Sequence, residues 1–438
     1  MQHMTFRRIK QGERLITQGE RGNYFYLILQ GSCAVNIEKN NMLYNRGQLS
    51  AGDVAGEIAL FSDELQRTNI DAETDTDVLS MSREEFEILS RENPDLRNFL
   101  SAVITHRLSA SKVAEDRKIG KYTVTEKISH GGTSIIYKGI HTLLNMVVAI
   151  KMLRHEMAAD PDFLEIFRNE AKTIAQLNHP NIVKVYDIEE LYNTVFIIME
   201  YLDGTLLKNM ISAKKKLSIS QIVDITMQVC YGLEYAHNHG IIHQDINPRN
   251  IFIQPDGQAR IIDFGLAIQR GGVDSNFLFP GTIYYIPPEQ LKGDPVDERA
   301  DIYSLGITVY EMITGKRPFS GCHMKTMVDW HLREDIPDTR VTIEDLPDEL
   351  HNFLMRTIRK DPSERYRNVT EALKELNPMA ERLGVKAQPQ FCKQNKVLGM
   401  FLVYQEEQQI ALKRFIEEFN KNVNGTGAVL RITHFEDV

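Results

Sequence analysis

The chain has 438 residues, of which 42% are hydrophobic and 25% charged, and its formal net charge at pH 7 is −9. This length exceeds what a single core accommodates and predicts two or three domains. The acidic balance argues against a general affinity for nucleic acid, whose phosphates attract basic surfaces. No apolar run approaches the roughly 20 residues that span a bilayer, and the N-terminal stretch lacks the apolar core of a signal peptide. We therefore expect a cytoplasmic protein without a membrane span.

The four cysteines, Cys33, Cys230, Cys322 and Cys392, lie far apart in the sequence. Their spacing excludes a zinc site of the CxxC type and gives no disulfide framework. We expect two or three of them to be small apolar core residues. This usage favours a reducing, cytoplasmic setting.

Residues 5–82 alternate short β-type runs with turns that contain glycine; the runs include "YFYLIL", "CAVNIE", "NIDAET" and "DVLSMS". Frequent short strands of this kind predict a small barrel or jelly roll, which we assign to residues 1–93. From Arg83 the pattern becomes helical. Apolar residues recur at three- and four-residue spacing from Leu96 to Leu108, which predicts a helix beginning near Pro94 and a rigid connection over 94–121.

A candidate ligand site lies in "VAGEIALFSDELQRTNIDAET", residues 54–74. Gly56 and Glu57 precede a short helical turn, and Arg67 and Thr68 follow it. Glu57 can accept a hydrogen bond from a sugar hydroxyl, and Arg67 with backbone N–H groups can hold a single phosphate. An ion pair between Glu57 and Arg67 at the surface is the alternative interpretation.

Together with "GERLITQGERGNYFYLILQGSCAV" upstream, this stretch makes residues 5 to about 117 resemble a cyclic-nucleotide-binding domain of the catabolite-activator type. The resemblance implies a β jelly roll that binds a cyclic nucleotide as an allosteric ligand. It implies these binding residues: Gly56, Glu57, Ile58, Ala59, Arg67 and Thr68. The choice between cyclic AMP and cyclic GMP stays open, and a barrel kept only for dimerisation is the competing hypothesis.

Residues 122–200 mix strands with one long helical stretch at 160–178. "ISHGGTSIIYK", residues 128–138, is a turn rich in Gly and Ser that lets backbone N–H groups approach a triphosphate, although a plain hairpin turn looks similar. "VVAIK" places Lys151 on the following strand, within reach of the α- and β-phosphates. Glu170 lies on the predicted helix, where it can hold Lys151 by an ion pair.

Residues 218–376 are mostly helical, with short strands around Asn250 and Arg260. Asp245 in "HQDINPRN" can accept a hydroxyl proton. Asn250 and Asp263, the latter in "DFG", supply hard oxygen ligands suited to Mg²⁺. Each piece has a simpler explanation alone, but their order and spacing together predict a nucleotide-binding kinase fold.

Residues 122 to about 376 resemble a bacterial-type serine/threonine protein kinase with a bilobal α+β fold. "GTIYYIPPEQ" with Thr282, "ADIYSLGITVYEMITGKRPF" with Asp301, and "KDPSERYRN" match this family as well. In the family, Arg365 of the last stretch pairs with the glutamate that is here Glu289. Thr282 resembles the version of the acceptor loop that is specific for Ser and Thr.

The resemblance implies ATP and Mg²⁺ as cofactors and Ser or Thr hydroxyls of proteins as acceptors. The implied catalytic residues are Asp245, Lys151, Glu170, Arg249 and Asn250, and the implied metal ligands are Asn250 and Asp263. The implied ATP-binding residues are Ile128, Ser129, His130, Gly131, Gly132, Thr133, Ser134, Ile136, Ala149, Lys151, Met199, Glu200, Leu202, Phe252 and Asp263.

Two positions of the catalytic loop depart from the family pattern. Gln244 replaces an Arg that pairs with a phosphorylated activation loop, so we predict that loop phosphorylation is not the main switch. Asn247 replaces a Lys at the transferring phosphoryl group, a loss on the order of 100- to 1000-fold in rate. Arg249, four residues after Asp245, can restore that charge; a side chain that points to solvent is the alternative.

The combination resembles cyclic-nucleotide-dependent protein kinases with a single sensor domain. It predicts an ATP-dependent Ser/Thr protein kinase that is regulated by cyclic nucleotide and is slow because of Asn247. A pseudokinase that binds ATP and signals through its shape is the first alternative, and a scaffold in which both domains only mediate assembly is the second. The apolar stripe of the connecting helix can also form the seam of a homodimer. Residues 377–395 are predicted as a linker, and 396–438 as a β-α-β tail for packing or oligomerisation.

Overall fold

The computed structural model describes residues 4–39, 42–57, 65–92, 118–130, 134–158, 160–191, 194–213, 216–265, 267–269, 282–319, 323–341 and 346–385. The predicted helix from 94, the turn at 131–133 and the tail from 396 lie outside these residues, as do Cys322 and Cys392. Of the cysteines, Cys33 and Cys230 are described, and both are buried free thiols.

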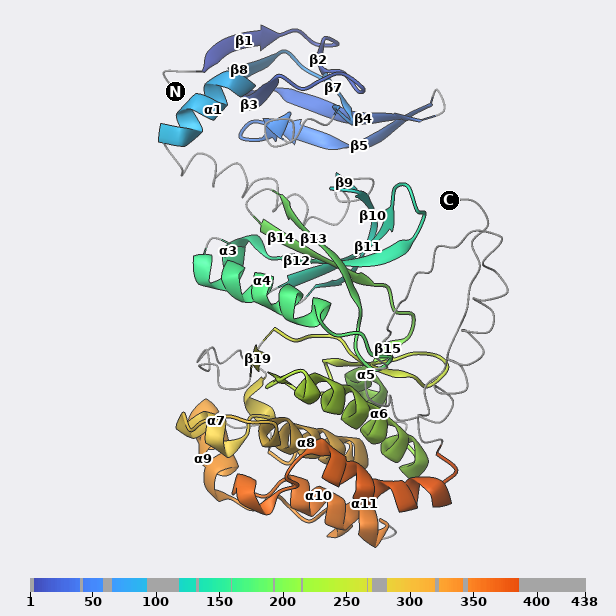
Figure 1. Ribbon diagram of the computed structural model, residues 1–438. Helices are drawn as coiled ribbons and strands as arrows, with labels where there is room; N and C mark the ends of the chain where they lie inside the picture. Colours follow the sequence, from blue (N-terminus) through green and yellow to red (C-terminus); the bar gives the residue numbers. More distant parts are fainter. Residues whose placement is uncertain are drawn as a thin grey trace, which may run out of the picture. The chain divides into compact units, whose positions relative to one another are not determined.

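The N-terminal part forms two four-stranded antiparallel sheets (Figure 1). In sheet order the first contains β1 (Thr5–Ile9), β8 (Thr76–Ser82), β3 (Tyr24–Gln30) and β6 (Val54–Ala55), and the second contains β2 (Arg14–Ile16), β7 (Asn69–Ala72), β4 (Ser32–Lys39) and β5 (Met42–Ser50). Alternate side chains of both sheets meet in one core, for example Ile28, Cys33 and Val78. The interleaved strand order is that of a jelly roll and confirms the predicted fold.

Helix α1 (Arg83–Glu92) follows the last strand and covers one end of this core. Its Phe86 is fully buried against Phe25, Val54 and Met81. The start at Arg83 agrees with the change from alternating to helical spacing in the sequence.

The kinase part begins with a six-stranded antiparallel sheet (Figure 1). In sheet order its strands are β13 (Val185–Leu191), β14 (Thr194–Glu200), β12 (Val147–Leu153), β11 (Ser134–His141), β10 (Tyr122–His130) and β9 (Lys118–Ile119). The short α3 (His155–Ala158) and the longer α4 (Pro161–Ala175) follow β12. Asp160 caps α4 by accepting from the N–H of Asp162, and Pro161 occupies the first turn, where no N–H is needed. The long helix predicted at 160–178 is thus confirmed.

The rest of the kinase part is mainly helical (Figure 1). Its helices are α5 (Leu207–Ser212), α6 (Ile219–Asn238), α7 (Pro288–Lys292), α8 (Arg299–Thr314), α9 (Met324–Arg333), α10 (Asp348–Thr357) and α11 (Val369–Arg382), with 3-10 turns η2 (Thr282–Tyr284), η3 (Thr339–Val341) and η4 (Pro362–Glu364). Its short strands are β15 (Thr205–Leu206), β16 (Ile241–Ile242), β17 (Ile251–Ile253), β18 (Ala259–Ile261) and β19 (Ile268–Gln269). Helix α8 is buried along nearly its whole length and forms the centre of this lobe.

Two boundaries differ from the expectation. Lys118 and Ile119 form β9 instead of the end of a helix, because Ile119 is fully buried in the core of the six-stranded sheet. Helix α11 runs through Pro378 to Arg382, into the predicted linker. Its buried Leu376 and Met379 continue the apolar stripe on both sides of the proline, and this packing outweighs the usual disruption.

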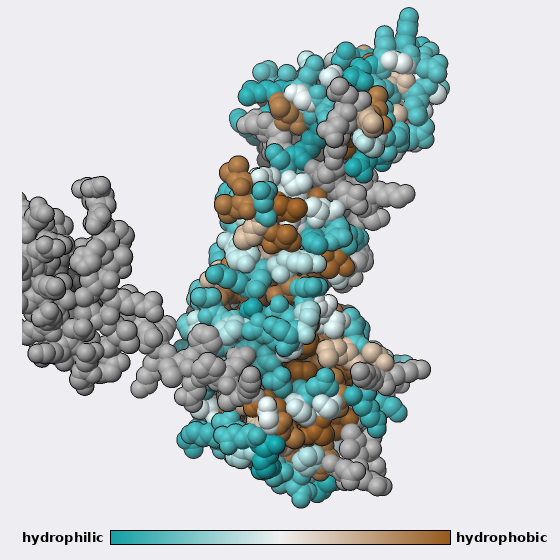
Figure 2. All heavy atoms as spheres, turned by 90° about the vertical axis from the view of Figure 1, so that its right-hand side faces the viewer, coloured by the Kyte–Doolittle hydropathy of each residue, from teal (hydrophilic) through white to brown (hydrophobic). Residues whose placement is uncertain are grey.

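On the face shown in Figure 2 hydrophilic residues alternate with smaller hydrophobic groups. The exposed large hydrophobic residues of the kinase part include Leu143, Leu144 and Val147 at the turn between β11 and β12. No helix among the described residues is long and apolar enough to cross a membrane.

Candidate active site

Lys151 lies in the middle of β12 and is held by two carboxylates. Its Nζ is 2.6 Å from Oε1 of Glu170 on α4 and 3.2 Å from Oδ1 of Asp263. The side chains of Lys151 and Glu170 are only 8% and 4% exposed. The ion pair predicted from the sequence is therefore formed in this structure, deep between the sheet and α4.

The charges of Lys151, Glu170 and Asp263 shift one another's pKa values. Burial lowers the pKa of Lys151, but the nearby Asp263 and Glu170 outweigh it and leave this pKa raised. Burial raises the pKa of Glu170, and the attraction of Lys151 only partly offsets it because the charge of Asp263 raises this pKa further. The pKa of Asp263 is lowered, because Lys151 and the Gly265 N–H outweigh the effect of its burial. The lysine thus stays charged at neutral pH.

Asp245 is held in a different way, by neutral amides. Nδ2 of Asn247 donates to its Oδ1 at 2.9 Å, and Nδ2 of Asn250 donates to its Oδ2 at 2.8 Å. Both amides also donate to the backbone oxygen of Asp245, at 3.0 and 2.9 Å. From the sequence we interpreted Asn247 only as the replacement of a lysine and did not predict its hydrogen bond to Asp245. Its position two residues after that aspartate was the signal for this contact.

Asp301, at the start of α8, fixes the backbone of the same loop. It is fully buried and accepts from the N–H groups of His243 and Gln244 at 2.9 and 2.7 Å, and its contact with Nε2 of His237 is 2.7 Å long. Burial would raise the pKa of Asp301, but these partners leave it lowered. Gln244 has φ +63°, a strained value for a residue with a side chain, which the two bonds of Asp301 stabilise.

Asn250 and Asp263 have the chemistry of an Mg²⁺ site. Because the NH₂ group of Asn250 is used on Asp245, its carbonyl oxygen is the atom left to bind a cation. Asp263 adds a carboxylate, whose Oδ1 also accepts from the N–H of Gly265 at 3.0 Å. A Cβ at Gly265 would lie 3.2 Å from that oxygen, which explains a glycine there. Hard oxygen ligands of this kind fit Mg²⁺.

The residues expected around an adenine base form part of one apolar cluster. Ala149 and Met199 are opposite each other in β12 and β14, and the half-buried Ile136 and Leu202 pack against the same cluster. Phe252 is half-buried in β17.

The remaining residues expected to bind ATP lie at the edges of this cluster. Glu200 ends β14 and accepts from Arg260 at 3.3 Å. Ile128 and Ser129 are exposed at the end of β10, next to His130, and Ser134 is half-buried at the start of β11. Gly131, Gly132 and Thr133 lie outside the described residues.

The described residues of the predicted sensor site lie directly after β6 and directly before β7. Gly56 has φ +79°, and a Cβ there would lie 2.6 Å from the carbonyl oxygen of Tyr24, so glycine is required by both sterics and conformation. Glu57 is 3% exposed. Arg67 and Thr68 are half-buried just before β7, and Ile58 and Ala59 lie outside the described residues.

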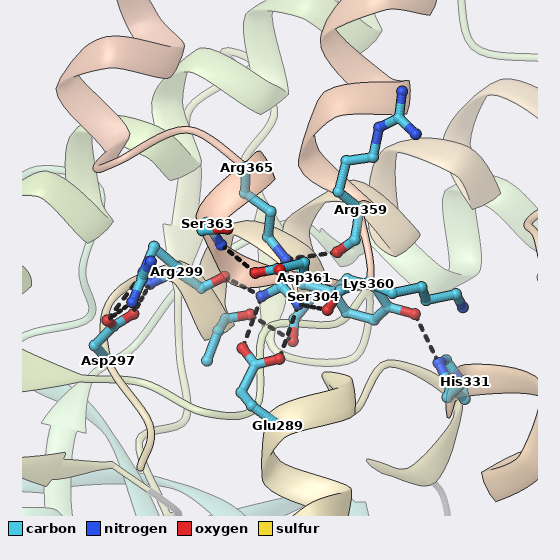
Figure 3. Close-up of polar contacts among 12 residues, drawn as sticks. Glu289, Asp297, Arg299, Ser304, His331, Arg359, Lys360, Asp361, Ser363 and Arg365 are labelled. Carbon is cyan, nitrogen blue, oxygen red and sulfur yellow. Dashed lines mark hydrogen bonds and ion pairs between the residues drawn. The ribbon is translucent and has the colours of Figure 1, made fainter. Parts of the chain in front are cut away.

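Arg365 anchors the segment that follows the acceptor loop, as Figure 3 shows. Its guanidinium binds both carboxylate oxygens of Glu289 at 2.7 and 2.8 Å, the pair predicted from the sequence. It also donates to the backbone oxygens of Arg359, Arg299 and Lys360, so all five N–H groups have acceptors. A completely buried guanidinium is stable only with such full pairing.

The fold and these contacts define a bilobal protein kinase, and comparisons with known proteins agree. The protein kinase domain model matches residues 122–376, more than half of the chain, and the cyclic nucleotide-binding domain model matches residues 6–93. The chain belongs to the protein kinase family and carries an N-terminal cyclic nucleotide-binding domain.

Several bacterial relatives are similar to the kinase part. The protein of Clostridium acetobutylicum named "Probable serine/threonine-protein kinase CA_C1728" is 37% identical over 259 residues, 59% of this chain and 39% of the relative. The serine/threonine-protein kinase PknA of Mycobacterium tuberculosis is 36% identical over 57% of this chain and 59% of its own length. The PknI kinase domain of Mycobacterium tuberculosis superposes with a TM-score of 0.50 at 27% identity, over 61% of this chain and 98% of that domain. The chain thus spans 39% of the length of the Clostridium acetobutylicum relative and 59% of the length of PknA.

Proposed function

We propose that the protein transfers the γ-phosphate of ATP to Ser or Thr hydroxyls of proteins, under the control of a cyclic nucleotide bound near Gly56 and Arg67. The buried ion pair between Lys151 and Glu170 carries this proposal. Burying these charges is costly and gains little stability compared with apolar packing, so their retention favours a functional role. The similarity to bacterial serine/threonine-protein kinases supports the choice of acceptor.

In this proposal Lys151 binds the α- and β-phosphates of ATP, while Asn250 and Asp263 hold Mg²⁺. Bound Mg²⁺ would neutralise charge on the β- and γ-phosphates. Asp245 orients the acceptor hydroxyl and accepts its proton. The amides of Asn247 and Asn250 fix both carboxylate oxygens and hold Asp245 in place for this task.

Asn247 also determines the rate of phosphoryl transfer that we expect. An amide at this position carries no charge, and its NH₂ group is already bonded to Asp245. The transferring phosphoryl group therefore lacks one preorganised cation, a loss of about 100- to 1000-fold in rate. The contribution of Arg249 to that charge stays a prediction, and we return to this residue below.

The path from the sensor to the kinase part is proposed to run through β9 and β13. A Cβ at Gly120, directly after β9, would meet the carboxylate of Glu189 on β13, so these two segments are in close contact. Lys121 pairs with Asp187 of β13 at 3.3 Å. A displacement of the segment before β9 thus acts directly on β13.

From β13 the path continues to the helix that carries Glu170. Arg168 of α4 makes two parallel bonds, 2.8 and 3.0 Å long, to Glu190 of β13. Because Arg168 is two residues before Glu170, movement of β13 shifts the partner of Lys151. The hypothesis is that cyclic nucleotide favours one of two positions of α4 by binding them unequally.

The test is transfer of labelled γ-phosphate to the chain itself and to a pool of Ser and Thr peptides, with and without cyclic AMP or cyclic GMP. Asp245→Asn is the matched control, because it keeps the shape and removes the charge. We expect transfer by the natural chain, a rate that changes with one cyclic nucleotide, and loss of transfer in the variant.

A pseudokinase is the second candidate, and the neutral Asn247 is the observation that favours it. Thermal melting separates this candidate from a scaffold, because a ligand that binds the native state raises the melting temperature. Stabilisation by Mg-ATP without any transfer would establish the pseudokinase.

A further inference from the structure

The charges of three cations act on Glu311, a half-buried carboxyl in α8. They are Arg317, Arg249 and Lys208, and the charges of all three act on Glu311. They come from the loop after α8, from the catalytic loop and from α5. Three segments far apart in the sequence thus place positive charge at one point of the molecule.

Hydrogen bonds from the backbone N–H groups fix the main chain at two of these residues. The N–H of Lys208 donates to the carbonyl oxygen of Pro248 at 2.9 Å, which places Lys208 beside Arg249. The N–H of Arg249 donates to Oδ1 of Asn247 at 2.9 Å. Both side chains are exposed, so their charges are available to a partner.

The third cation is fixed by an aromatic ring. The guanidinium of Arg317 lies 3.7 Å from the ring centre of Tyr284. The next residue, Tyr285, donates its hydroxyl to the carboxylate of Glu311. Both tyrosines belong to "GTIYYIPPEQ", the stretch that resembles an acceptor loop.

Glu311 does not neutralise this group. Three positive charges face one carboxyl, and burial raises the pKa of Glu311 in spite of the Tyr285 hydrogen bond and the three cations. The cations thus outnumber the carboxyl of Glu311, although the whole chain carries a net charge of −9.

The position of Lys208, Arg249 and Arg317 relates these cations to the Ser or Thr segment that accepts the phosphoryl group. An acceptor hydroxyl must come within about 3 Å of Asp245 to give up its proton. Arg249 follows Asp245 by four residues in the same loop, and its charge acts on Tyr285 and Glu311. In the proposed reaction the residues that flank the hydroxyl lie next to this loop, whereas the phosphates of ATP lie at Lys151 and at the Mg²⁺ that Asn250 and Asp263 would hold.

We propose that Lys208, Arg249 and Arg317 select acceptor segments that carry acidic residues next to the phosphorylated Ser or Thr. This inference rests on the proposed kinase function and names its substrate class. Complementary charges across an interface give specificity and a faster encounter, and each exposed charge pair contributes a modest amount.

The test measures binding and transfer separately, on the full chain with Mg²⁺ and a non-hydrolysable ATP analogue for binding and with ATP for transfer. Three fluorescent Thr peptides are compared by anisotropy; they are identical except that the flanking positions are acidic, neutral amide or lysine. We expect the acidic peptide to bind about 10-fold more tightly than the neutral one at low salt, and Lys208→Gln and Arg249→Gln each to reduce this ratio about 2- to 3-fold. Arg333→Gln, at the exposed end of α9, is the matched control and keeps the ratio.

Equal binding of the three peptides, or tighter binding of the lysine peptide, would overturn the inference. So would an unchanged acidic preference in both Lys208→Gln and Arg249→Gln. A variant Arg249→Gln that loses turnover equally on all three peptides, with the binding ratio intact, would assign Arg249 to the transferring phosphoryl group instead. Acidic preference in binding without any phosphoryl transfer would support this inference and refute the proposed function alone.

Discussion

Lys151 and Asp245 are stabilised in opposite ways. Lys151 is buried, and its ammonium touches two carboxylates. Asp245 is half-buried, and its two oxygens accept hydrogen bonds from the neutral amides of Asn247 and Asn250. A buried charge without its partner is costly, so removing one member of this group alone is strongly destabilising. Neutral amides suffice to hold Asp245, and the sequence departs from the family pattern in that loop.

The strongest test of this contrast removes the ammonium of Lys151. Lys151→Met leaves Glu170 and Asp263 facing each other without a cation, and we expect a loss of about 3 to 5 kcal/mol in the free energy of unfolding. Phosphoryl transfer should disappear as well. Chemical denaturation measures the first effect and labelled ATP the second.

The double variant Lys151→Met, Glu170→Met is the control for that experiment. It removes both buried charges and should recover most of the lost stability, because Asp263 is 36% exposed and can be solvated. Transfer should stay absent. A single variant as stable as the natural chain would show that the charges around Lys151 are not coupled.

The next test returns a charge to the catalytic loop. Asn247→Lys places an ammonium where the transferring phosphoryl group lacks one, and we expect a rate about 10- to 100-fold higher, below the full effect because the hydrogen bond to Asp245 is lost. Asn247→Gln, which keeps a neutral amide, is the control. An unchanged rate in Asn247→Lys would indicate that Arg249 already supplies the missing charge.

His331 adds a third case to the comparison of Lys151 and Asp245, because it is a buried titratable group that carries no charge in the folded protein. It is fully buried beside the Tyr303 hydroxyl at 3.0 Å, and burial, with the charge of Lys360, lowers its pKa to about 3. The folded protein keeps this imidazole neutral, whereas the unfolded chain protonates it below pH 6.5. Its contribution to stability is therefore present above that pH and is lost as the pH falls toward 3.

From His331 we expect the free energy of unfolding to be about 2 kcal/mol lower at pH 5 than at pH 8. Urea unfolding at the two pH values measures it, and His331→Gln should remove that share of the fall. The exposed His323→Gln is the control and should leave the pH dependence as it is. Equal slopes in the natural chain and in His331→Gln would contradict the account.

The smallest expected effect concerns the link between the N-terminal sensor and the kinase part. Arg168→Gln breaks the bonds from α4 to Glu190, and we expect the ratio of rates with and without cyclic nucleotide to fall up to about 5-fold, since exposed ion pairs contribute at most about 1 kcal/mol. Arg340→Gln, which removes an exposed pair with Asp338, is the control. An unchanged ratio would place the coupling elsewhere.

Much of the fold followed from local patterns. Alternating strands at 5–82 predicted the jelly roll, and the helical stretch at 160–178 predicted α4, since both elements bury one face. The pair of Arg365 and Glu289 followed from the family pattern. These features have strong signals within a few residues or within known motifs.

Other features depend on contacts between distant segments. β9 has two residues and exists because Ile119 enters the core of a sheet formed by later strands. The helix through Pro378 is maintained by buried neighbours that local propensity does not reveal. The group of Lys208, Arg249 and Arg317 joins residues more than 100 positions apart, so no sequence window contains it.

The most direct measurement is the initial rate of γ-phosphate transfer by the full chain, compared with Asp245→Asn at equal occupancy by Mg-ATP. We predict slow but clear transfer to Ser or Thr by the natural chain, and a rate reduced at least 100-fold in the variant. Equal rates in both proteins, or no transfer by the natural chain with either cyclic nucleotide present, would contradict the account.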